Sequence, residues 1–496
     1  MTTVRTTEQG VSLFTSFDPR TGEAVGEHPV DDAAAVAAAV AAARAAQPRW
    51  DGLGFAGRKQ LLDAWRRLIV ARAGELIDLI RAETGKTADD ARLELVLVVD
   101  HLRWAAANAE RVLRRRRVAP GLLMFNQAAT VAYRPLGVVG VIGPWNYPAF
   151  IPMGPLSAAL AAGNTVVLKP SELTPGVGKW LAGTLAEVVP GPAVVHVVTG
   201  FGETGAALCR SGVDKIAFTG SSATGRRVMA ACAENLTPVV IEGGGKDAMI
   251  VDRDADLAAA ADAAVWASMS NAGQTCVGLE RVYVVDTVAD RFLGLVRDRA
   301  AALRTGDRPD ADLGPIVMPR QTEIIAGHVR DAVARGARVV LGGEEAVVPP
   351  FVTPVVLADV PEDSTALTEE TFGPVVVVNR VADTDEAVEK ANASRYGLGA
   401  SVYARADGPA IAAKLKAGMV SVNAVIAFAG IPALPFGGVG DSGFGRVHGP
   451  DGLREFSRTQ AVTRQRFRPV LRPNSYRRPA GTMTVLIRMI RITHGR

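Results

Sequence analysis

Residues 215–225 read KIAFTGSSATG, and this stretch carries the pattern that decides the fold. The apolar run KIAF has the length and residue types of a buried strand. The small residues after it are typical of a helix start, where free backbone N–H groups attract a pyrophosphate. The segment is not a GxGxxG, so the usual fingerprint of a dinucleotide-binding fold is absent, and alone it is a weak signal.

Similar apolar runs alternate with helix-like stretches on both sides of this segment. The first series comprises 139–143, 165–168, 194–198 and 238–242, and a second comprises 248–251, 281–285, 338–343 and 374–378. This alternation of strand-like and helix-like segments predicts parallel strands joined by crossover helices, as in nucleotide-binding folds. The two series predict two α/β domains. Before them, apolar spacing predicts helices over 32–47, 57–82 and 87–114.

The composition excludes several classes of protein. A chain of 496 residues predicts two or three domains, and 48% hydrophobic residues are enough for large cores. The net charge is only +4. The one dense basic run, RVLRRRR at 111–117, is interpreted as a solvated helix face rather than a phosphate site. No nucleic-acid-binding signature accompanies it, so we expect no nucleic-acid partner.

Three cysteines cannot form a disulfide framework in so long a chain, and the polar start MTTVRTTEQG lacks a signal-peptide core. We therefore expect a cytoplasmic protein. The uncharged stretch 136–168 is long enough to span a bilayer, but its many glycines and prolines favour buried strands and a helix. The tail, 472–496, contains VLIRMIRI and could be an amphipathic helix on a membrane surface. Docking on the same or a partner subunit is the favoured interpretation.

Three segments contain candidate catalytic residues. Cys276 ends SNAGQTC at 270–276; a thiolate attacks carbonyl carbon strongly, although a cysteine is more often a buried apolar residue. Glu242 ends a strand before three glycines and could be a general base, or only a surface acid. Asn146 lies in GPWNYP at 143–148 and could donate to an oxyanion, or only form a turn. The segment LKPSE at 168–172 offers groups suited to ribose hydroxyls. Each signal is weak by itself.

Taken in chain order, these motifs resemble the aldehyde dehydrogenase superfamily. They are PWNYP, LKPSE, FTGS, the glutamate before GGK, GQTC, EETFGPV (369–375), and PFGG with SGFGR. The resemblance covers roughly residues 15–465, and Glu242 and Cys276 stand thirty-four positions apart, as the family's base and nucleophile do.

The resemblance implies the chemistry of the site. Cys276 would attack the aldehyde, Asn146 would hold the oxyanion, and Glu242 would activate the water that hydrolyses the thioester. The residues implied at the cofactor are Trp145, Lys169, Ser171, Glu172, Gly220, Ser221, Glu370 and Phe372. Because Glu172 would repel a 2′-phosphate, NAD is expected rather than NADP. No metal is expected.

The resemblance also implies an α/β aldehyde dehydrogenase-like fold with a Rossmann-type cofactor domain, a catalytic domain and a small β oligomerisation flap. The cofactor domain would comprise 1–117, 136–244 and 431–448, the catalytic domain 245–430, the flap 118–135 and 449–467, and the tail 468–496. A homodimer or homotetramer is expected, with no integral membrane segment.

Two departures from the family pattern bear on the site. Gly243 replaces a common leucine and should loosen the backbone beside Glu242. Gly154 stands where many succinate-semialdehyde enzymes carry an arginine for the substrate's distal carboxylate. The apolar stretch 424–435 should line the substrate tunnel, which favours apolar aliphatic or aromatic aldehydes slightly over succinate semialdehyde. Alternatives are a coenzyme-A-acylating relative, which Glu242 argues against, and a non-catalytic binding protein on the same scaffold.

Overall fold

The computed structural model describes residues 4–6, 12–468 and 472–495. The chain divides into two compact units. The larger unit contains residues 1–112 and 135–457, and the smaller contains residues 113–134 and 458–496.

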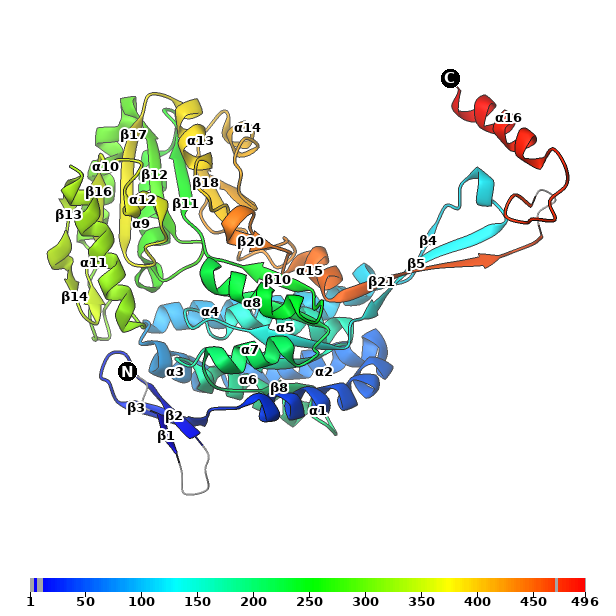
Figure 1. Ribbon diagram of the computed structural model, residues 1–496. Helices are drawn as coiled ribbons and strands as arrows, with labels where there is room; N and C mark the ends of the chain where they lie inside the picture. The colour runs from blue at the N-terminus through cyan, green and yellow to red at the C-terminus, as the bar shows by residue number, and fades with distance from the viewer. Residues whose placement is uncertain (1–3, 7–11, 469–471, 496) are drawn as a thin grey trace. The chain divides into compact units, whose positions relative to one another are not determined.

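A six-stranded sheet forms the first half of the larger unit (Figure 1). Its strands, in spatial order, are β20 (Gly443–Phe444), β10 (Val239–Glu242), β9 (Lys215–Thr219), β6 (Val138–Ile142), β7 (Thr165–Lys169) and β8 (Val195–Val197). All pairs are parallel except β20 with β10. The five strands of the first predicted series are therefore confirmed, each within about a residue or two of the expected bounds.

Helices cover this sheet because their apolar residues face it. Residues of α1 (Ala33–Gly52), α7 (Gly202–Arg210) and α8 (Ser222–Ala233) share one core cluster with strand residues such as Ile216. Helices α5 (Phe150–Ala162) and α6 (Pro175–Val188) also contact the strands, and α2 (Gly54–Ala71) packs on both of them. Asp32 caps α1 by accepting the N–H of Ala35, which confirms the predicted helix start.

The helix predicted over 57–82 is two helices in the structure. Helix α2 ends at Ala71 and α3 (Ala73–Thr84) begins after Arg72, whose φ of −107° and ψ of +29° are not helical. Helix α4 (Ala88–Leu113) follows. The uncharged stretch 136–168 forms β6, a loop, α5 and β7, as predicted. Within the described residues, no helix has the length and apolar character needed to cross a membrane.

A seven-stranded sheet forms the second half of the larger unit. Its strands, in spatial order, are β13 (Arg338–Leu341), β16 (Val355–Ala358), β17 (Val375–Val381), β12 (Leu279–Val285), β11 (Asp247–Val251), β18 (Gly399–Tyr403) and β19 (Met419–Val422). Only the edge strand β13 is antiparallel to its neighbour. The strands of the second predicted series all lie in this sheet.

Alternate residues of β11 face opposite layers of helices. Met249 and Val251 pack with α9 (Leu257–Met269) and α10 (Asp286–Ala301), whereas Ala248 and Ile250 pack with α13 (Thr384–Asn392) and α14 (Gly408–Ala412). A sheet covered on both faces explains why its strands are continuously apolar. The remaining elements of the unit are β1 (Val4–Thr6), β2 (Ser12–Phe17), β3 (Ala24–Pro29), α11 (Pro319–Ala334), β14 (Val347–Val348), β15 (Phe351–Val352), α12 (Thr365–Thr368), α15 (Gly449–Glu455) and the short 3₁₀ turns at 270–273, 344–346 and 440–442.

The smaller unit contains a three-stranded sheet and one helix. The strand order is β21 (Ser457–Gln465), β5 (Gln127–Pro135) and β4 (Arg116–Val118), with a 3₁₀ turn at 122–124, and the helix is α16 (Thr482–His494). Helix α15 belongs to the larger unit, and the tail belongs to the smaller one. The interpretation of 111–117 as a helix face is wrong beyond Leu113, where α4 ends and the arginines lead into β4.

Candidate active site

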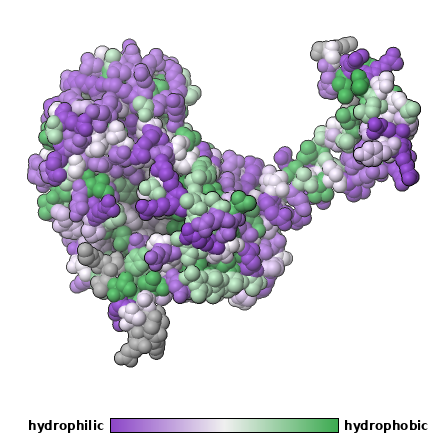
Figure 2. Space-filling model, viewed as in Figure 1, coloured by the Kyte–Doolittle hydropathy of each residue, from purple (hydrophilic) through white to green (hydrophobic). Residues whose placement is uncertain are grey.

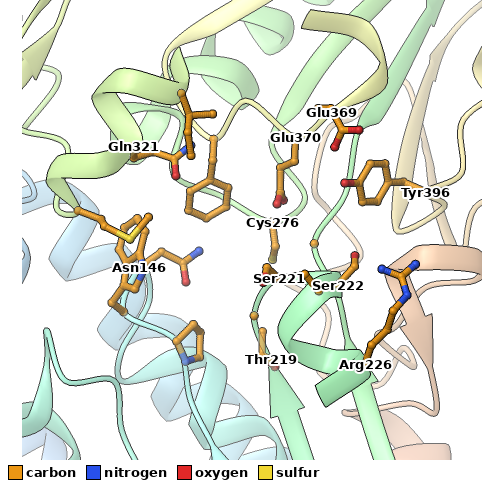
Figure 3. Close-up of a pocket in the computed structure, with 18 of the residues that line it drawn as sticks. Asn146, Thr219, Ser221, Ser222, Arg226, Cys276, Gln321, Glu369, Glu370 and Tyr396 are labelled. Atoms are coloured by element: carbon orange, nitrogen blue, oxygen red, sulfur yellow. The ribbon is translucent and has the colours of Figure 1, made fainter. Parts of the chain in front are cut away.

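A polar cavity of about 390 Å³ lies beside the carboxyl ends of β9 and β10, in the larger unit. Its lining comprises Pro144, Trp145, Asn146, Thr219–Ala223, Arg226, Gly244, Cys276, Met318, Gln321, Ile324, Glu369, Glu370, Phe372, Arg395 and Tyr396. In Figure 3, Cys276 lies between Asn146 and the residues that open helix α8. The outer ends of parallel strands are where α/β proteins bind nucleotides.

The segment that carries Cys276 is held rigidly by its own side chains. After α9, Asn271 and Ala272 adopt left-handed φ values of 53° and 54°. The Gln274 amide donates to the carbonyls of Asn271 (3.0 Å) and Pro315 (3.1 Å) and accepts from the N–H of Val317 at 2.9 Å. Left-handed non-glycine residues cost energy and persist only where such bonds fix them. The loop therefore holds Cys276 in one position.

Cys276 is the one cysteine of the three that is not fully buried, and all three are free thiols. Cys209 and Cys232 lie in the core cluster under α7 and α8. Burial, with the negative charge and hydrogen bond of Glu242, raises the pKa of the Cys276 thiol well above its usual value. In this state Cys276 is a protonated thiol that needs a base or a nearby positive charge to become a nucleophile.

Asn146 lies directly beside this loop. Its side-chain Nδ2 donates to the carbonyl of Gln274 at 3.0 Å, which leaves the second N–H of the amide for another acceptor. Its own backbone carbonyl accepts from Asn271 Nδ2 at 3.1 Å and from Lys86 Nζ at 2.7 Å. Two hydrogen bonds, to Gln274 and from Asn271, therefore fix Asn146 to the loop that contains Cys276.

A buried ion pair supports the segment that contains Asn146. Lys86 Nζ lies 2.8 Å from the Glu94 carboxylate, and both side chains are inaccessible to solvent. Glu94 also accepts the N–H groups of Ala149 (2.8 Å) and Phe150 (3.1 Å), where helix α5 begins. Sequence reasoning missed both residues, since no motif marks a lysine and a glutamate eight positions apart.

Glu242 occupies the last position of β10. Burial raises the pKa of Glu242 to about 7, and the neighbouring Cys276 thiol and Thr219 hydroxyl offset part of that effect. Thr219 Oγ1 donates to one carboxylate oxygen at 3.4 Å, whereas the other has no partner among the described groups. A buried carboxyl with a free oxygen and a pKa near neutrality has the properties of a general base.

The expectation that Gly243 loosens the backbone beside Glu242 is wrong. The N–H of Gly243 donates to Ser442 at 3.0 Å, and its carbonyl accepts from Ser222 Oγ at 2.6 Å. A Cβ at this position would stand 2.5 Å from the carbonyl oxygen of Asp441. Glycine is therefore required because two backbone segments approach each other closely here, and the two hydrogen bonds fix the backbone at this residue.

A second cavity, of about 70 Å³, lies on the other side of Cys276. Its lining comprises Leu93, Leu97, Tyr147, Phe150, Ile151, Glu242, Trp266, Ser270, Thr275, Cys276, Val277, Ile426, Ala429, Phe436, Val447 and His448. From the stretch 424–435, which was expected to line the tunnel, Ile426 and Ala429 do so. Cys276 belongs to both cavities.

Two histidines lie at the edge of this apolar cavity. The rings of His101 and His448 are 4.1 Å apart, and His101 Nε2 donates to the carbonyl of Ala429 at 3.0 Å. Burial lowers the pKa of His101 to about 4 and that of His448 well below its usual value. Both rings are therefore neutral at pH 7. A Cβ at Gly154 would stand 2.6 Å from His448 Nε2, so His448 occupies the space beside residue 154.

Five of the eight predicted cofactor residues line the polar cavity: Trp145, Gly220, Ser221, Glu370 and Phe372. Trp145 and Phe372 form an edge-to-face pair with ring centroids 5.5 Å apart. Ser221 caps helix α8 by accepting the N–H of Thr224 at 3.3 Å. Glu370 accepts the N–H of Gly245 at 3.0 Å, and burial raises its pKa to about 8.

The other three predicted cofactor residues are not part of the cavity lining: Lys169 is the last residue of β7, and Ser171 and Glu172 follow that strand. Lys169 is buried, 3.9 Å from Glu172, and burial lowers its pKa. Sequence reasoning also missed several lining residues: Arg226, Met318, Gln321, Glu369, Arg395 and Tyr396. Most of these come from segments without a motif, so only the fold shows that they meet.

The profile of the aldehyde dehydrogenase family matches residues 5–462, which leaves the last 34 residues beyond the match. The chain therefore belongs to the aldehyde dehydrogenase family and is an oxidoreductase that acts on aldehydes. It has the aldehyde dehydrogenase fold: an NAD-dependent aldehyde dehydrogenase from Sinorhizobium meliloti superposes with a TM-score of 0.89 at 34% identity, over 94% of this chain and 93% of that one.

Sequence relatives cover nearly the whole chain as well. A Mycobacterium tuberculosis protein, provisionally named succinate-semialdehyde dehydrogenase NADP(+) 2, is 40% identical over 90% of this chain and 87% of its own length. A 4,4'-diapolycopene aldehyde oxidase from a Methylomonas species is 37% identical over 94% of this chain and 88% of its own.

Proposed function

We propose that the chain oxidises an apolar aldehyde to a carboxylic acid through a thioester on Cys276. The observation that carries the proposal is the place of Cys276, where a polar cavity at a helix N-terminus meets an apolar cavity. A nucleophile shared by the two can bind a substrate carbon from one side and present it to a cofactor on the other.

The polar cavity suits a nicotinamide dinucleotide. Residues 220–223, at the N-terminus of α8, present backbone N–H groups of the kind that bind a pyrophosphate, and Ser221 fixes that end. Glu370 offers the oxygens of its carboxyl group to ribose hydroxyls, beside the Trp145 and Phe372 rings. When bound, the oxidised nicotinamide supplies a hydride acceptor and a positive charge, which favours the Cys276 thiolate.

The residues of the chain supply the remaining chemistry. The Cys276 sulfur would bond to the aldehyde carbon after its proton leaves to solvent, which the positive charge of a bound nicotinamide favours. The free N–H of Asn146 then stabilises the alkoxide. With a bound nicotinamide as the hydride acceptor, this adduct on Cys276 would become a thioester. Glu242 takes a proton from water, which attacks the thioester carbon, and the S–C bond breaks to release the acid and the thiol. The balance is one aldehyde, one water and one oxidised cofactor to one acid, one reduced cofactor and one proton.

The apolar cavity supports an uncharged substrate. No lysine or arginine is among its lining side chains, all of which the structure describes. The two histidines at its edge are neutral, and Gly154 provides no cation. A substrate carboxylate buried there would have no partner, which is costly. Relatives carry a succinate-semialdehyde name, which makes that substrate the second candidate.

A panel of kcat/KM values over hexanal, benzaldehyde and succinate semialdehyde tests the substrate class. We expect both apolar aldehydes to exceed succinate semialdehyde, with free acid as the product. Higher kcat/KM for succinate semialdehyde would overturn the apolar proposal. An acyl-CoA product, formed only with added coenzyme A, would support the acylating alternative.

We further propose that NAD⁺ is preferred over NADP⁺, because Glu172 is an anion near the expected ribose site. Its charge is partly offset by Lys169, 3.9 Å away. Glu172→Gln should raise the ratio of NADP⁺ to NAD⁺ efficiency about tenfold. Native enzyme that uses NADP⁺ more efficiently than NAD⁺ would contradict this assignment. We also propose a homodimer or homotetramer, formed through an edge of the three-stranded sheet of the smaller unit.

A further inference from the structure

The smaller unit has an extreme charge composition. Residues 113–134 and 458–496 number 61 and contain 15 arginines, no lysine and no aspartate or glutamate. All 51 acidic residues of the chain therefore lie in the larger unit, together with 40 of the 55 basic ones, which gives that unit a net charge of −11. The overall charge of +4 conceals two parts of opposite sign.

Helix α16 combines this charge with a wide apolar face. At 100° per residue, its apolar side chains span most of the circumference, and Arg488 and Arg491 lie together on the remaining side. The apolar side chains exposed by 43–71% are Met483, Val485, Ile487, Ile490 and Ile492. Only Thr482 and Leu486 of this helix are buried. In Figure 2, green and purple residues lie side by side over this unit.

Further exposed apolar side chains lie on the loop and strand end of the same unit. Leu123, Met124 and Phe125 are 44–56% exposed, and Phe467 is 49% exposed. The Phe125 and Phe467 rings contact each other with centroids 5.6 Å apart. Of the 26 exposed large hydrophobic residues in the described chain, 11 belong to this small unit. Such concentration of apolar surface marks a binding face.

We propose that the smaller unit binds the surface of a lipid bilayer that contains anionic phospholipids, with α16 lying in the plane of the headgroups. Thirteen residues are too few to span a bilayer, which needs about 20. A helix with a basic face and an apolar face lies at the interface instead. Arginine guanidinium groups match phosphate geometry, and the charge excess attracts anionic lipid.

The alternative occupants fit the same features less well. Nucleic acid would satisfy the arginines but offers little to the broad apolar face of α16. A second copy of the chain could offer its negatively charged larger unit to the arginines. The exposed apolar face of α16 would, however, also need a matching apolar groove on that copy. The helix also lies beyond residue 462, where the family match ends. A bilayer surface supplies both partners, phosphate and hydrocarbon.

Co-flotation of the full-length protein with vesicles tests the proposal. We expect binding to vesicles of phosphatidylglycerol and phosphatidylcholine, weak binding to phosphatidylcholine alone, and loss of most binding at about 1 M salt, where charges are screened beyond about 3 Å. No flotation with the anionic vesicles, or equal flotation with both compositions, would overturn the proposal. Tighter binding to duplex DNA than to the anionic vesicles would also overturn it.

Point variants separate the two contributions. Arg488→Gln with Arg491→Gln should weaken vesicle binding about thirtyfold, since each arginine near an anionic surface contributes about 1 kcal/mol. Ile487→Ser with Ile490→Ser should weaken it at least as much. Matched controls on the larger unit are Arg253→Gln with Arg320→Gln and Leu236→Ser with Val348→Ser, all exposed positions. Controls that reduce binding as strongly as the α16 variants would contradict the assignment to α16.

The mass of the protein by light scattering distinguishes lipid binding from self-association. We expect every α16 variant to keep the native oligomeric mass and full activity on a water-soluble aldehyde. A drop in mass in Ile487→Ser with Ile490→Ser would show that α16 docks on a second copy, and would overturn the membrane proposal while leaving the proposed dehydrogenase function intact.

Discussion

The two cavities that meet at Cys276 differ in their lining. The larger one contains arginine, glutamate, serine and backbone N–H groups at a helix end, whereas the smaller one is almost wholly apolar, with Glu242 as its single charged side chain. The proposed reaction needs this difference. A dinucleotide needs charge and hydrogen bonds, and a thioester needs protection from all water except the molecule that Glu242 activates.

One short segment contributes walls to both cavities. Trp145 and Asn146 face the polar cavity, and Tyr147, Phe150 and Ile151 face the apolar one. Lys86 and Glu94 hold this segment from behind. Both cavities therefore depend on the same buried Lys86–Glu94 pair.

Removing the charge of Glu94, which pairs with the buried Lys86, should have the largest effect on stability. Glu94→Gln leaves Lys86 buried without a counter-charge, which should cost about 3–5 kcal/mol of unfolding free energy. Denaturant unfolding measures it. The matched control, Asp63→Asn, breaks a solvent-accessible pair with Lys59 and should cost about 1 kcal/mol or less. Equal small losses in both variants would show that the buried pair does not support the site.

On the polar side, Asn146→Ala should lower kcat about 10²–10³-fold, because an oxyanion donor acts mainly in the transition state. The substrate KM and the melting temperature should change little. Asn235→Ala, which removes an exposed amide elsewhere, serves as the control. A loss of less than about threefold in Asn146→Ala would remove Asn146 from the catalytic residues.

The pH dependence of acid release tests Glu242, which lines the apolar cavity beside Cys276. Burial raises the pKa of Glu242 to about 7, and only the ionised form accepts a proton from water. The hydrolysis rate should therefore rise about tenfold per pH unit below about pH 7 and level off above it. Rapid-quench measurement of acid release across this pH range gives the hydrolysis rate as a function of pH. A midpoint near the ordinary value of a glutamate would contradict the assignment.

The smallest expected effect belongs to the apolar side. Gly154→Ala places a methyl group 2.6 Å from His448 Nε2, which should displace the ring and lower kcat/KM for benzaldehyde about tenfold. Affinity for the reduced cofactor should not change. The control, Gly183→Ala, adds its methyl group in open space on helix α6. Equal activity of both variants would show that His448 does not shape this cavity.

Local sequence patterns predicted five strands of the first sheet and four of the second, and part of the cavity lining around Cys276; they missed β16, β18, β19 and β20. Apolar runs bounded by glycine and proline located the strands because those signals act over a few residues. The site motifs lie at strand ends and helix starts, where the chain turns toward the cavity. The resemblance to a family then assigned roles that no single motif could carry.

The features that sequence missed depend on contacts between distant segments. Lys86 bonds a carbonyl 60 positions along the chain, and nothing near it in sequence indicates that partner. The requirement for glycine at 243 comes from the Asp441 carbonyl, nearly 200 positions away. The break at Arg72 and the strand after Leu113 interrupt patterns that looked continuous, because apolar spacing does not mark where a helix stops.

The most direct test of the central claim is mass spectrometry of the Glu242→Gln variant after one exposure to an apolar aldehyde and oxidised cofactor. The account predicts about one reduced cofactor per subunit and an acyl group on the peptide that contains Cys276, because the thioester forms but water is not activated. Continued turnover, or an acyl group absent from Cys276, would contradict it.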